Sequence, residues 1–287
     1  MKTKRNIRAV VLFTGMAAGL IITSSCLKKA NVYAPKKPIQ PVNGFYSSDA
    51  VDAANLVAYW PFNGDLTDSL SKTAGVATGT SFGTGVEGKG LQGANNGYVV
   101  TNVPAAVQAV HSFTVTTWVN MPENVNGAVG ILDIANTQNF WGNLDIFFDN
   151  GATATTGVLK VHVWNKSGSS TGSDAWEGGY TVTKPWNNWI HIAVTYNDET
   201  STVTVYYNGA VVGTNKATGF APLDWSQAKQ MVFGTLQFQT NPSLTSNTGS
   251  QSWASFMTGV MDQVRIYNTA LSTNDIGAIY GLEKLGR

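Results

Sequence analysis

The sequence predicts an all-β fold, and three observations lead to this prediction. Only 12% of the 287 residues are charged, whereas 43% are hydrophobic and 30 residues are glycine. From residue 56 onward, short runs rich in β-branched and aromatic residues alternate with clusters of Gly, Asn, Ser and Thr, which is typical of sandwiches and barrels. No repeat of fixed period and no break in composition divides this region. Residues 53–287 are therefore expected to form one β domain.

The individual elements follow from local patterns. The clearest strand-like runs cover residues 56–62, 98–103, 112–120, 128–134, 144–148, 158–164, 190–196, 203–207, 231–238 and 259–267. Asn208-Gly209 lies between two alternating strands and predicts a type I′ hairpin, because both turn residues must accept positive φ. One helix is expected near the end, with Ser272 as its N-cap, Asp275 three residues later, and Gly281 as a C-terminal stop.

The charge and cysteine content exclude several classes of protein. The chain has 18 Lys+Arg and 17 Asp+Glu, and from residue 50 onward it has 10 basic and 16 acidic residues, a net charge of −6. This balance lacks the basic footprint of a nucleic-acid binder, so no nucleic acid is expected as a partner. A single cysteine excludes a disulfide framework and any multi-cysteine zinc or iron–sulfur site.

The N-terminus has the pattern of an export signal. Basic residues occupy several of the first eight positions, and the uncharged, mostly apolar run 9–22 is shorter than the roughly 20 residues of a spanning helix. Small residues at 23–25 then precede Cys26, the only cysteine. This order resembles a bacterial lipoprotein signal, in which residues 1–25 are removed and Cys26 is lipidated. The alternative is a secretory signal with an incidental cysteine.

Residues 26–52 are predicted to be the lipidated Cys26 and a flexible tether. Pro35, Pro38 and Pro41 alternate with lysines and favour an extended chain. The chain is therefore expected in the bacterial cell envelope as an outer-membrane lipoprotein, facing the periplasm or the cell surface. Contact with the membrane is expected through the lipid anchor only.

Four segments carry a resemblance to a known family. Leu56–Gly64, Phe113–Val119, Trp189–Tyr196 and Phe256–Ser272 resemble, in the same order, the signatures of laminin-G-like jelly rolls in the concanavalin A-like lectin/glucanase superfamily. The stretch after Asp68-Ser69 departs from the usual pattern. The resemblance implies an antiparallel jelly-roll sandwich of two sheets with one short C-terminal helix. Because the family includes sugar-binding modules, adhesins, pentraxin-like proteins and appendages of glycosidases, the fold does not decide the activity.

The carboxylates do not form the pattern expected of a glycosidase. Retaining glycosidases need two carboxyl groups about 5 Å apart, and catalytic relatives in this superfamily carry Glu-x-Asp-x-x-Glu on one strand. Residues 132–135, with Asp133, and residues 144–149, with Asp145 and Asp149, come closest, and neither stretch contains a glutamate. No Gly-x-Ser-x-Gly elbow or zinc-type histidine spacing is present in the sequence. We expect no catalysis; the alternative is a glycoside hydrolase or lyase that uses Asp145 and Asp149 as acids.

A structural calcium site is the one cofactor that the sequence predicts. Calcium binds six to eight oxygen ligands, and Asn63, Asp65 and Asp68 bring such oxygens into one tight turn. The resemblance places this turn near the closing strand, where Asp262 lies. The alternative is that Asp65 and Asp68 only cap turns through hydrogen bonds to the backbone.

Strand alternation predicts an exposed ligand platform. In residues 158–164 the alternate apolar residues face the core, so that His162 and Trp164 share the opposite face; in residues 144–148 Asp145 and Phe147 point outward. If these strands pair, the four side chains form an exposed patch suited to a glycan. The alternative is that long loops cover this face.

The remaining aromatic residues divide into core and loop candidates. Trp60, Trp118 and Trp189 lie within the signature strands and are expected in the core. Trp141 and Trp176 lie in turn-rich segments with polar neighbours and are better binding candidates. The predicted ligand-binding residues are Trp141, Asp145, His162, Trp164 and Trp176. Together with the lipoprotein signal before Cys26, these residues predict a lipoprotein that binds a glycan or another surface ligand. The other alternative is an adhesive lipoprotein that binds a protein through the same loops.

Overall fold

The computed structural model describes residues 38–166, 172–220 and 222–287. The predicted leader, Cys26 and the predicted tether up to residue 37 lie outside these residues. The chain divides into units 1–39 and 40–287, and the fold below is that of the second unit. This unit begins earlier than the predicted boundary at residue 53, because Ser48 and Val51 are already buried in it. No helix among the described residues has the length and apolar character needed to cross a membrane.

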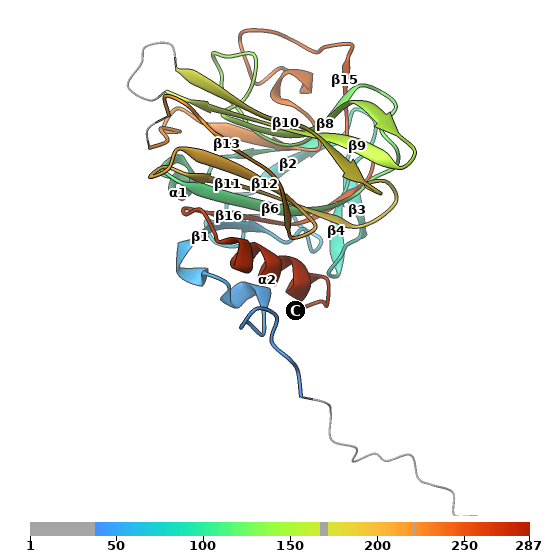
Figure 1. The fold of residues 1–287 in the computed structure, drawn as a ribbon. Helices are drawn as coiled ribbons and strands as arrows, with labels where there is room; N and C mark the ends of the chain where they lie inside the picture. The colour runs from blue at the N-terminus through green and yellow to red at the C-terminus, as the bar shows by residue number, and fades with distance from the viewer. Residues whose placement is uncertain (1–37, 167–171, 221) are drawn as a thin grey trace, which may run out of the picture. The chain divides into compact units, whose positions relative to one another are not determined.

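The predicted two-sheet, all-β sandwich is confirmed, with eight strands in each sheet (Figure 1). The first sheet has the order β13-β12-β11-β6-β16-β4-β3, with β1 paired to β16; the second has the order β10-β9-β8-β7-β14-β5-β2, with β15 paired to β7. The strands of the first sheet are β1 (Leu56–Trp60), β3 (Ser81–Thr84), β4 (Lys89–Gln92), β6 (Phe113–Asn120), β11 (Ile190–Asn197), β12 (Thr202–Tyr207), β13 (Ala210–Lys216) and β16 (Val260–Tyr267). Those of the second sheet are β2 (Gly75–Thr78), β5 (Tyr98–Asn102), β7 (Ala128–Ile134), β8 (Leu144–Thr153), β9 (Thr156–Asn165), β10 (Ser173–Thr183), β14 (Gln230–Phe233) and β15 (Ala254–Ser255).

The strands missing from the prediction are short or irregular. β2, β3 and β4 have four residues each, and β10 contains a bulge between Gly178 and Tyr180 that breaks its alternation. The predicted strand 231–238 ends at Phe233, because Gly234 turns the chain with a φ of 90° and a 3₁₀ helix, η3 (Gln237–Gln239), follows. Asn208 and Gly209 both have positive φ, as the predicted hairpin turn requires.

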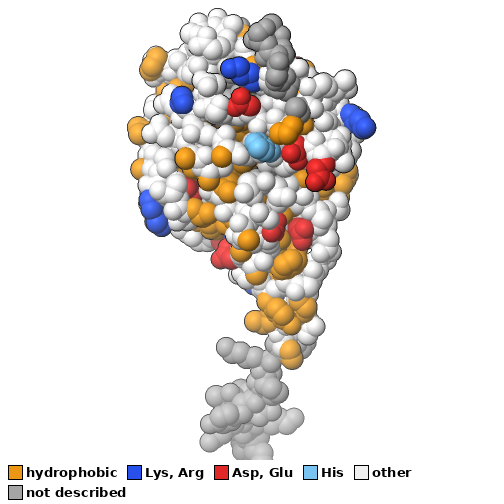
Figure 2. Space-filling model, turned by 90° about the vertical axis from the view of Figure 1, so that its left-hand side faces the viewer, with side chains coloured by type: hydrophobic (Ala, Val, Ile, Leu, Met, Phe, Trp, Pro, Cys, Tyr) orange, Lys and Arg blue, Asp and Glu red, His pale blue; other side chains and the backbone are white. Residues whose placement is uncertain are grey.

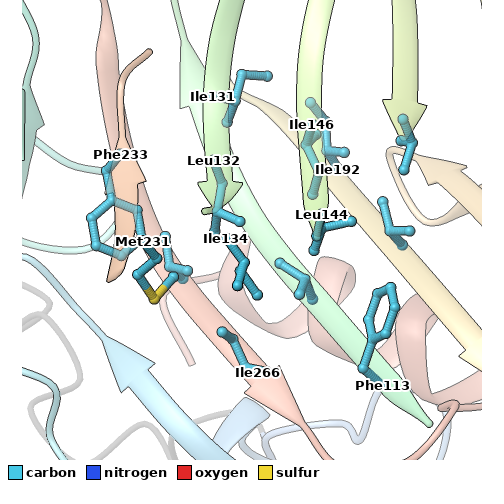
Figure 3. Close-up of a cluster of buried hydrophobic side chains, with 14 of the residues drawn as sticks. Phe113, Ile131, Leu132, Ile134, Leu144, Ile146, Ile192, Met231, Phe233 and Ile266 are labelled. Atoms are coloured by element: carbon cyan, nitrogen blue, oxygen red, sulfur yellow. The ribbon is translucent and has the colours of Figure 1, made fainter. Parts of the chain in front are cut away.

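The core lies between the two sheets and is built from alternating side chains of both. Figure 3 shows Leu144 and Ile146 from β8 pointing toward the same interior as Phe113 and Ile192 of the first sheet. Burying each such side chain contributes about 1.5–3 kcal/mol relative to leaving it in water. The inward faces predicted for residues 144–148 and 158–164 are therefore confirmed.

Helix α2 (Thr273–Glu283) covers the outer face of the first sheet (Figure 1). Its predicted N-cap is confirmed, since Ser272 and Asp275 form a capping box. The predicted stop at Gly281 is wrong, because the helix continues to Glu283. A Cβ at Gly281 would lie 2.7 Å from Val42 Cγ1, so this glycine permits close contact with the N-terminal segment of the unit. The shorter helices are α1 (Ala105–Gln108), η1 (Ser48–Ala50) and η2 (Ala53–Asn55).

A buried ion pair fixes the end of α2. Glu283 Oε1 accepts a hydrogen bond of 2.8 Å from Arg265 Nε, and Glu283 Oε2 accepts one of 2.7 Å from Trp118 Nε1. Trp118 is buried as predicted, but under α2 on the outer face of its sheet. Because removing one partner of a buried ion pair leaves an uncompensated charge, this contact ties the last turn of α2 to β6 and β16.

Candidate functional site

Residues 144–148 and 158–164 pair, which was the condition for the predicted patch, and the pairing brings most of the candidate side chains together. In the register of the second sheet, Asp145 lies opposite Asp133 on β7 and His162 on β9, and His162 lies opposite Trp176 on β10. The prediction that this patch is exposed is wrong. Asp145 and His162 are both 0% exposed, and Phe147 is buried as well.

A long segment between β14 and β16 covers the outer face of the second sheet. Leu236, Phe238 and Ala254 from this segment pack against Phe147 in a cluster separate from the main core. The covering segment passes directly over Gly130 on β7, where a Cβ would lie 2.2 Å from the carbonyl carbon of Thr235. The alternative that loops cover this face is therefore the correct one.

Beneath this cover, His162 bridges two carboxylates. Its Nδ1 lies 2.8 Å from Asp145 Oδ2, and its Nε2 lies 2.7 Å from Asp174 Oδ1. Both ring nitrogens must carry hydrogen to donate to two carboxylates, which is the charged form of the ring. Burial disfavours that form, but the hydrogen bonds and charges of Asp145 and Asp174 outweigh burial and raise the pKa of His162.

Asp133 lies opposite Asp145 on the neighbouring strand, and the sequence analysis did not predict it as a ligand-site residue. Its Oδ2 accepts a hydrogen bond of 2.7 Å from the backbone N–H of Gln237 in the covering segment. Burial raises the pKa of Asp133 well above its ordinary value, and the neighbouring Asp145 raises it further. The charged form of Asp133 is therefore disfavoured. Hydrogen bonds through His162 join β8, β9 and β10, and Asp133 of β7 lies next to Asp145.

The two aspartates proposed as catalytic acids have separate partners. Asp145 is buried and bonded to His162, whereas Asp149 is half-buried with its Oδ2 2.5 Å from Lys160 Nζ. They do not face each other across an open groove, which is what a retaining or inverting pair needs.

The exposed part of the site is a group of three indole rings, Trp141, Trp176 and Trp253, which we call the tryptophan face. Trp176 is 46% and Trp253 37% exposed, and Trp141 lies between them, with ring centroids 4.9 Å from Trp176 and 5.9 Å from Trp253. Trp141 stacks on the buried Phe147 at 5.5 Å, and Trp176 lies 4.4 Å from the His162 ring. Trp176 therefore rests on the buried, hydrogen-bonded ring of His162, and Trp141 rests on the buried ring of Phe147.

Trp176 lies on a strand, so its prediction as a loop residue is wrong. Ala175 and Glu177 are buried while Asp174 and Trp176 are exposed, which is the alternation of a strand. The alternation of apolar and polar residues is not evident in the sequence, because one of the buried residues, Glu177, is charged. Glu177 is accommodated there by the amide of Asn215 and the hydroxyl of Tyr180.

A hollow of about 360 Å³ lies beside Trp176, between β10 and β13. Its polar lining includes the side chains of Asp174, Asn215, Lys216 and Thr218. Carboxylate, amide, ammonium and hydroxyl groups therefore stand next to an exposed indole ring.

Trp164 is the one candidate that lies apart. It is half-buried opposite Asp174, and a Cβ on Gly172 would lie 2.3 Å from its ring. Among the described residues, no aromatic ring contact joins Trp164 to the tryptophan face.

The oxygens of the predicted calcium ligands bind backbone N–H groups. Asp68 accepts from Tyr59 N at 2.7 Å and from Ser71 N at 2.8 Å, and Asp65 accepts from Thr67 N at 2.8 Å. These bonds are the ones expected if Asp65 and Asp68 cap turns, which was the alternative to a calcium site.

Asn63 and Asp262 contact a different turn. Asn63 Oδ1 accepts from Lys89 N at 2.8 Å, and Asp262 Oδ2 accepts from Glu87 N at 3.0 Å. Burial raises the pKa of Asp262 to about 7. No three acidic, histidine or cysteine side chains come together as metal ligands within the described residues. The calcium site therefore stays a prediction, and Asp65 and Asp68 already accept hydrogen bonds from backbone N–H groups.

Comparison with known proteins agrees with this architecture. The family model of the concanavalin A-like lectin/glucanases superfamily, Laminin_G_3, matches residues 92–277. The chain belongs to this family of jelly-roll domains. No curated protein matches the chain.

Solved structures with the same fold include bacterial toxin binding domains. The binding domain of Paraclostridial Mosquitocidal Protein 1 has a TM-score of 0.58 and 17% identity over 79% of this chain and 52% of that one. The binding domain of Botulinum neurotoxin DC matches in complex with SialylT (TM-score 0.55, 14% identity, 80% of this chain and 52% of that one). It also matches in complex with rat synaptotagmin II (TM-score 0.55, 13% identity, 80% and 52%). This chain spans about half the length of these domains.

Proposed function

We propose that residues 40–287 form a non-catalytic domain that binds carbohydrate on the tryptophan face and in the hollow beside Trp176. The observation that carries the proposal is the exposed Trp176 ring with Asp174 two residues away on the same face of β10. The Asp174 side chain is 58% exposed although one of its oxygens is bonded to His162. An indole ring packs against the C–H face of a sugar, and the neighbouring polar groups bond its hydroxyls.

The rigidity of this surface supports binding. Trp176 and Trp141 are held by the ring of His162 and by Phe147, both of which are buried. Side chains that are already fixed before binding lose less conformational entropy when a ligand arrives. A surface of this kind needs no rearrangement to present its rings.

Two alternatives have less support. The separate partners of Asp145 and Asp149 argue against a glycosidase. A protein partner would favour one broad apolar surface, whereas the hydrophobic side chains on the face in Figure 2 occur in small groups separated by other side chains and backbone. The toxin domains named with a sialylated ligand and with synaptotagmin are each about twice as long as the matched region, so their ligands do not assign one to this chain.

We also propose that Cys26 carries a lipid and that the residues following it tether the domain to a bacterial outer membrane. The support is the order of basic, apolar and small residues before the only cysteine. Two acyl chains suffice for stable anchoring.

The experiment is a glycan array with the chain from Gln40 to Arg287, which contains both sheets and their core. We expect glycan signals that Trp176→Ala removes and that Phe82→Ala, an exposed aromatic on the first sheet, retains. No glycan signal for the unaltered chain would overturn the carbohydrate proposal and favour a protein partner. Release of free sugar from a bound glycan would overturn the non-catalytic part.

A further inference from the structure

A second pocket lies far from the tryptophan face in the fold, between the last turn of α2 and the first sheet. It has a volume of about 470 Å³ and shares no lining residue with the hollow beside Trp176. Its walls come from the β10–β11 connection, the β12–β13 turn and α2. Trp189, predicted to lie in the core, is half-buried and lines this pocket instead.

The walls of the pocket are aromatic and fixed. Tyr280 on α2 stacks on the buried Trp118, with ring centroids 5.5 Å apart and 21° between their planes. Tyr207 is almost fully buried and its hydroxyl donates a hydrogen bond of 2.8 Å to the carbonyl of Thr183. With Trp189 these rings offer a flat apolar surface to a small ligand.

The charged groups that line this pocket are both lysines. Lys184 and Lys284 are exposed, and no aspartate or glutamate is among the lining residues. The neighbouring Glu283 faces inward, with its two oxygens bonded to Arg265 and Trp118. In a domain whose acidic residues outnumber its basic ones 16 to 10 from residue 50 onward, this is a local excess of positive charge.

Lys184 holds a backbone conformation beside the pocket that a lysine adopts only at a cost. Lys184 has a φ of 52°, in the left-handed region that favours glycine or asparagine, and Asn187 and Asn208 have φ values of 55° and 51°. An asparagine or glycine would fold into position 184 at lower cost, and strained residues cluster at functional sites. Within the described part of the chain, the Lys184 ammonium makes no hydrogen bond or ion pair, so it is available to a ligand.

We propose that this pocket binds an acidic sugar, a monosaccharide unit that carries a carboxylate. The aromatic walls would contact its ring, Lys184 and Lys284 its carboxylate, and the amide of Asn208 a hydroxyl. Asn208 Oδ1 already accepts from the backbone N–H of His191, which leaves its Nδ2 to donate. This site is independent of the proposed tryptophan face.

The test is a titration of the chain from Gln40 to Arg287 with D-glucuronate, followed by ¹⁵N NMR. We expect saturable chemical-shift changes at the side-chain amides of Asn188 and Asn208, with an affinity that falls as the salt concentration rises. The double variant K184Q/K284Q should lose at least about tenfold in affinity, since two charge-assisted contacts disappear. Lys229→Gln, which removes a lysine outside the pocket, should bind as the unaltered chain does.

Three results would overturn this inference. The first is the absence of shifts at Asn188 and Asn208 when glucuronate is added to the unaltered chain. The second is equal binding of D-glucose, which has no charge. The third is equally strong, lysine-dependent binding of inorganic sulfate, which would make the pocket a simple anion site. Trp176→Ala should leave glucuronate binding unchanged, so failure of the carbohydrate proposal for the tryptophan face is separable from failure here.

Discussion

Replacing His162 by alanine tests whether the buried network supports the candidate site. The His162 ring is 0% exposed and makes hydrogen bonds of 2.8 and 2.7 Å to Asp145 and Asp174. Alanine would leave the fully buried Asp145 carboxylate without its counter-charge, and breaking a buried pair in this way costs about 3–5 kcal/mol. That is a large part of the roughly 5–15 kcal/mol by which a domain is stable.

The assay is urea unfolding of the chain from Gln40 to Arg287, followed by circular dichroism. We expect the free energy of unfolding to fall by about 3–5 kcal/mol for His162→Ala. Asp174→Asn should cost about 1 kcal/mol or less, because the Asp174 side chain is 58% exposed and water replaces its bond. His111→Ala is the matched control, since His111 is exposed. A loss below about 1 kcal/mol for His162→Ala would refute the account of a buried, charge-paired histidine.

Three further predictions follow from the same structure. Because the pKa of His162 is raised in the folded state, its contribution to stability should be complete below pH about 6.5 and decline as the pH rises through the folded pKa. The difference in urea midpoint between the unaltered chain and His162→Gln should therefore shrink from pH 6 to 9. A difference that grows over this range would contradict the prediction. Gly130→Ala should destabilise by about 1–3 kcal/mol in the same assay, because its Cβ would meet the Thr235 backbone at 2.2 Å and displace the covering segment; an unchanged midpoint would show that the segment does not lie on β7. If Asp65 and Asp68 only cap turns, calcium or EDTA should leave the melting temperature within about 1 °C, because their oxygens already accept hydrogen bonds from backbone N–H groups. A clear rise with calcium would instead favour the predicted calcium site.

The alternation of residues along the chain predicted the features that depend on one strand alone, namely its bounds and its inward face. The inward faces of β8 and β9 follow from alternation, whereas the pairing that sets Asp145 opposite His162 was only a condition of the predicted patch. The bounds of β7, residues 128–134, agree with the prediction because an apolar run with clear turn residues on both sides defines them.

Contacts between segments far apart in the sequence could not be predicted from alternation along a single strand. The cover over Asp145 comes from residues more than 80 positions later, and the only local sign of it is Gly130, whose missing side chain makes room for Thr235. Asp133 was not predicted as a site residue because it lies in an apolar run, and its position opposite Asp145 depends on the pairing of two strands. Trp176 was placed in a loop because the inward Glu177 breaks the alternation that marks a strand.

The central claim is that the tryptophan face binds carbohydrate, and titration calorimetry tests it most directly. The strongest glycan from the array would be titrated into the unaltered chain from Gln40 to Arg287, into Trp176→Ala and into Phe82→Ala. Loss of a central aromatic contact of about 2 kcal/mol weakens binding roughly 30-fold. We predict that loss for Trp176→Ala and unchanged affinity for Phe82→Ala. Equal affinity of Trp176→Ala and the unaltered chain would contradict the account.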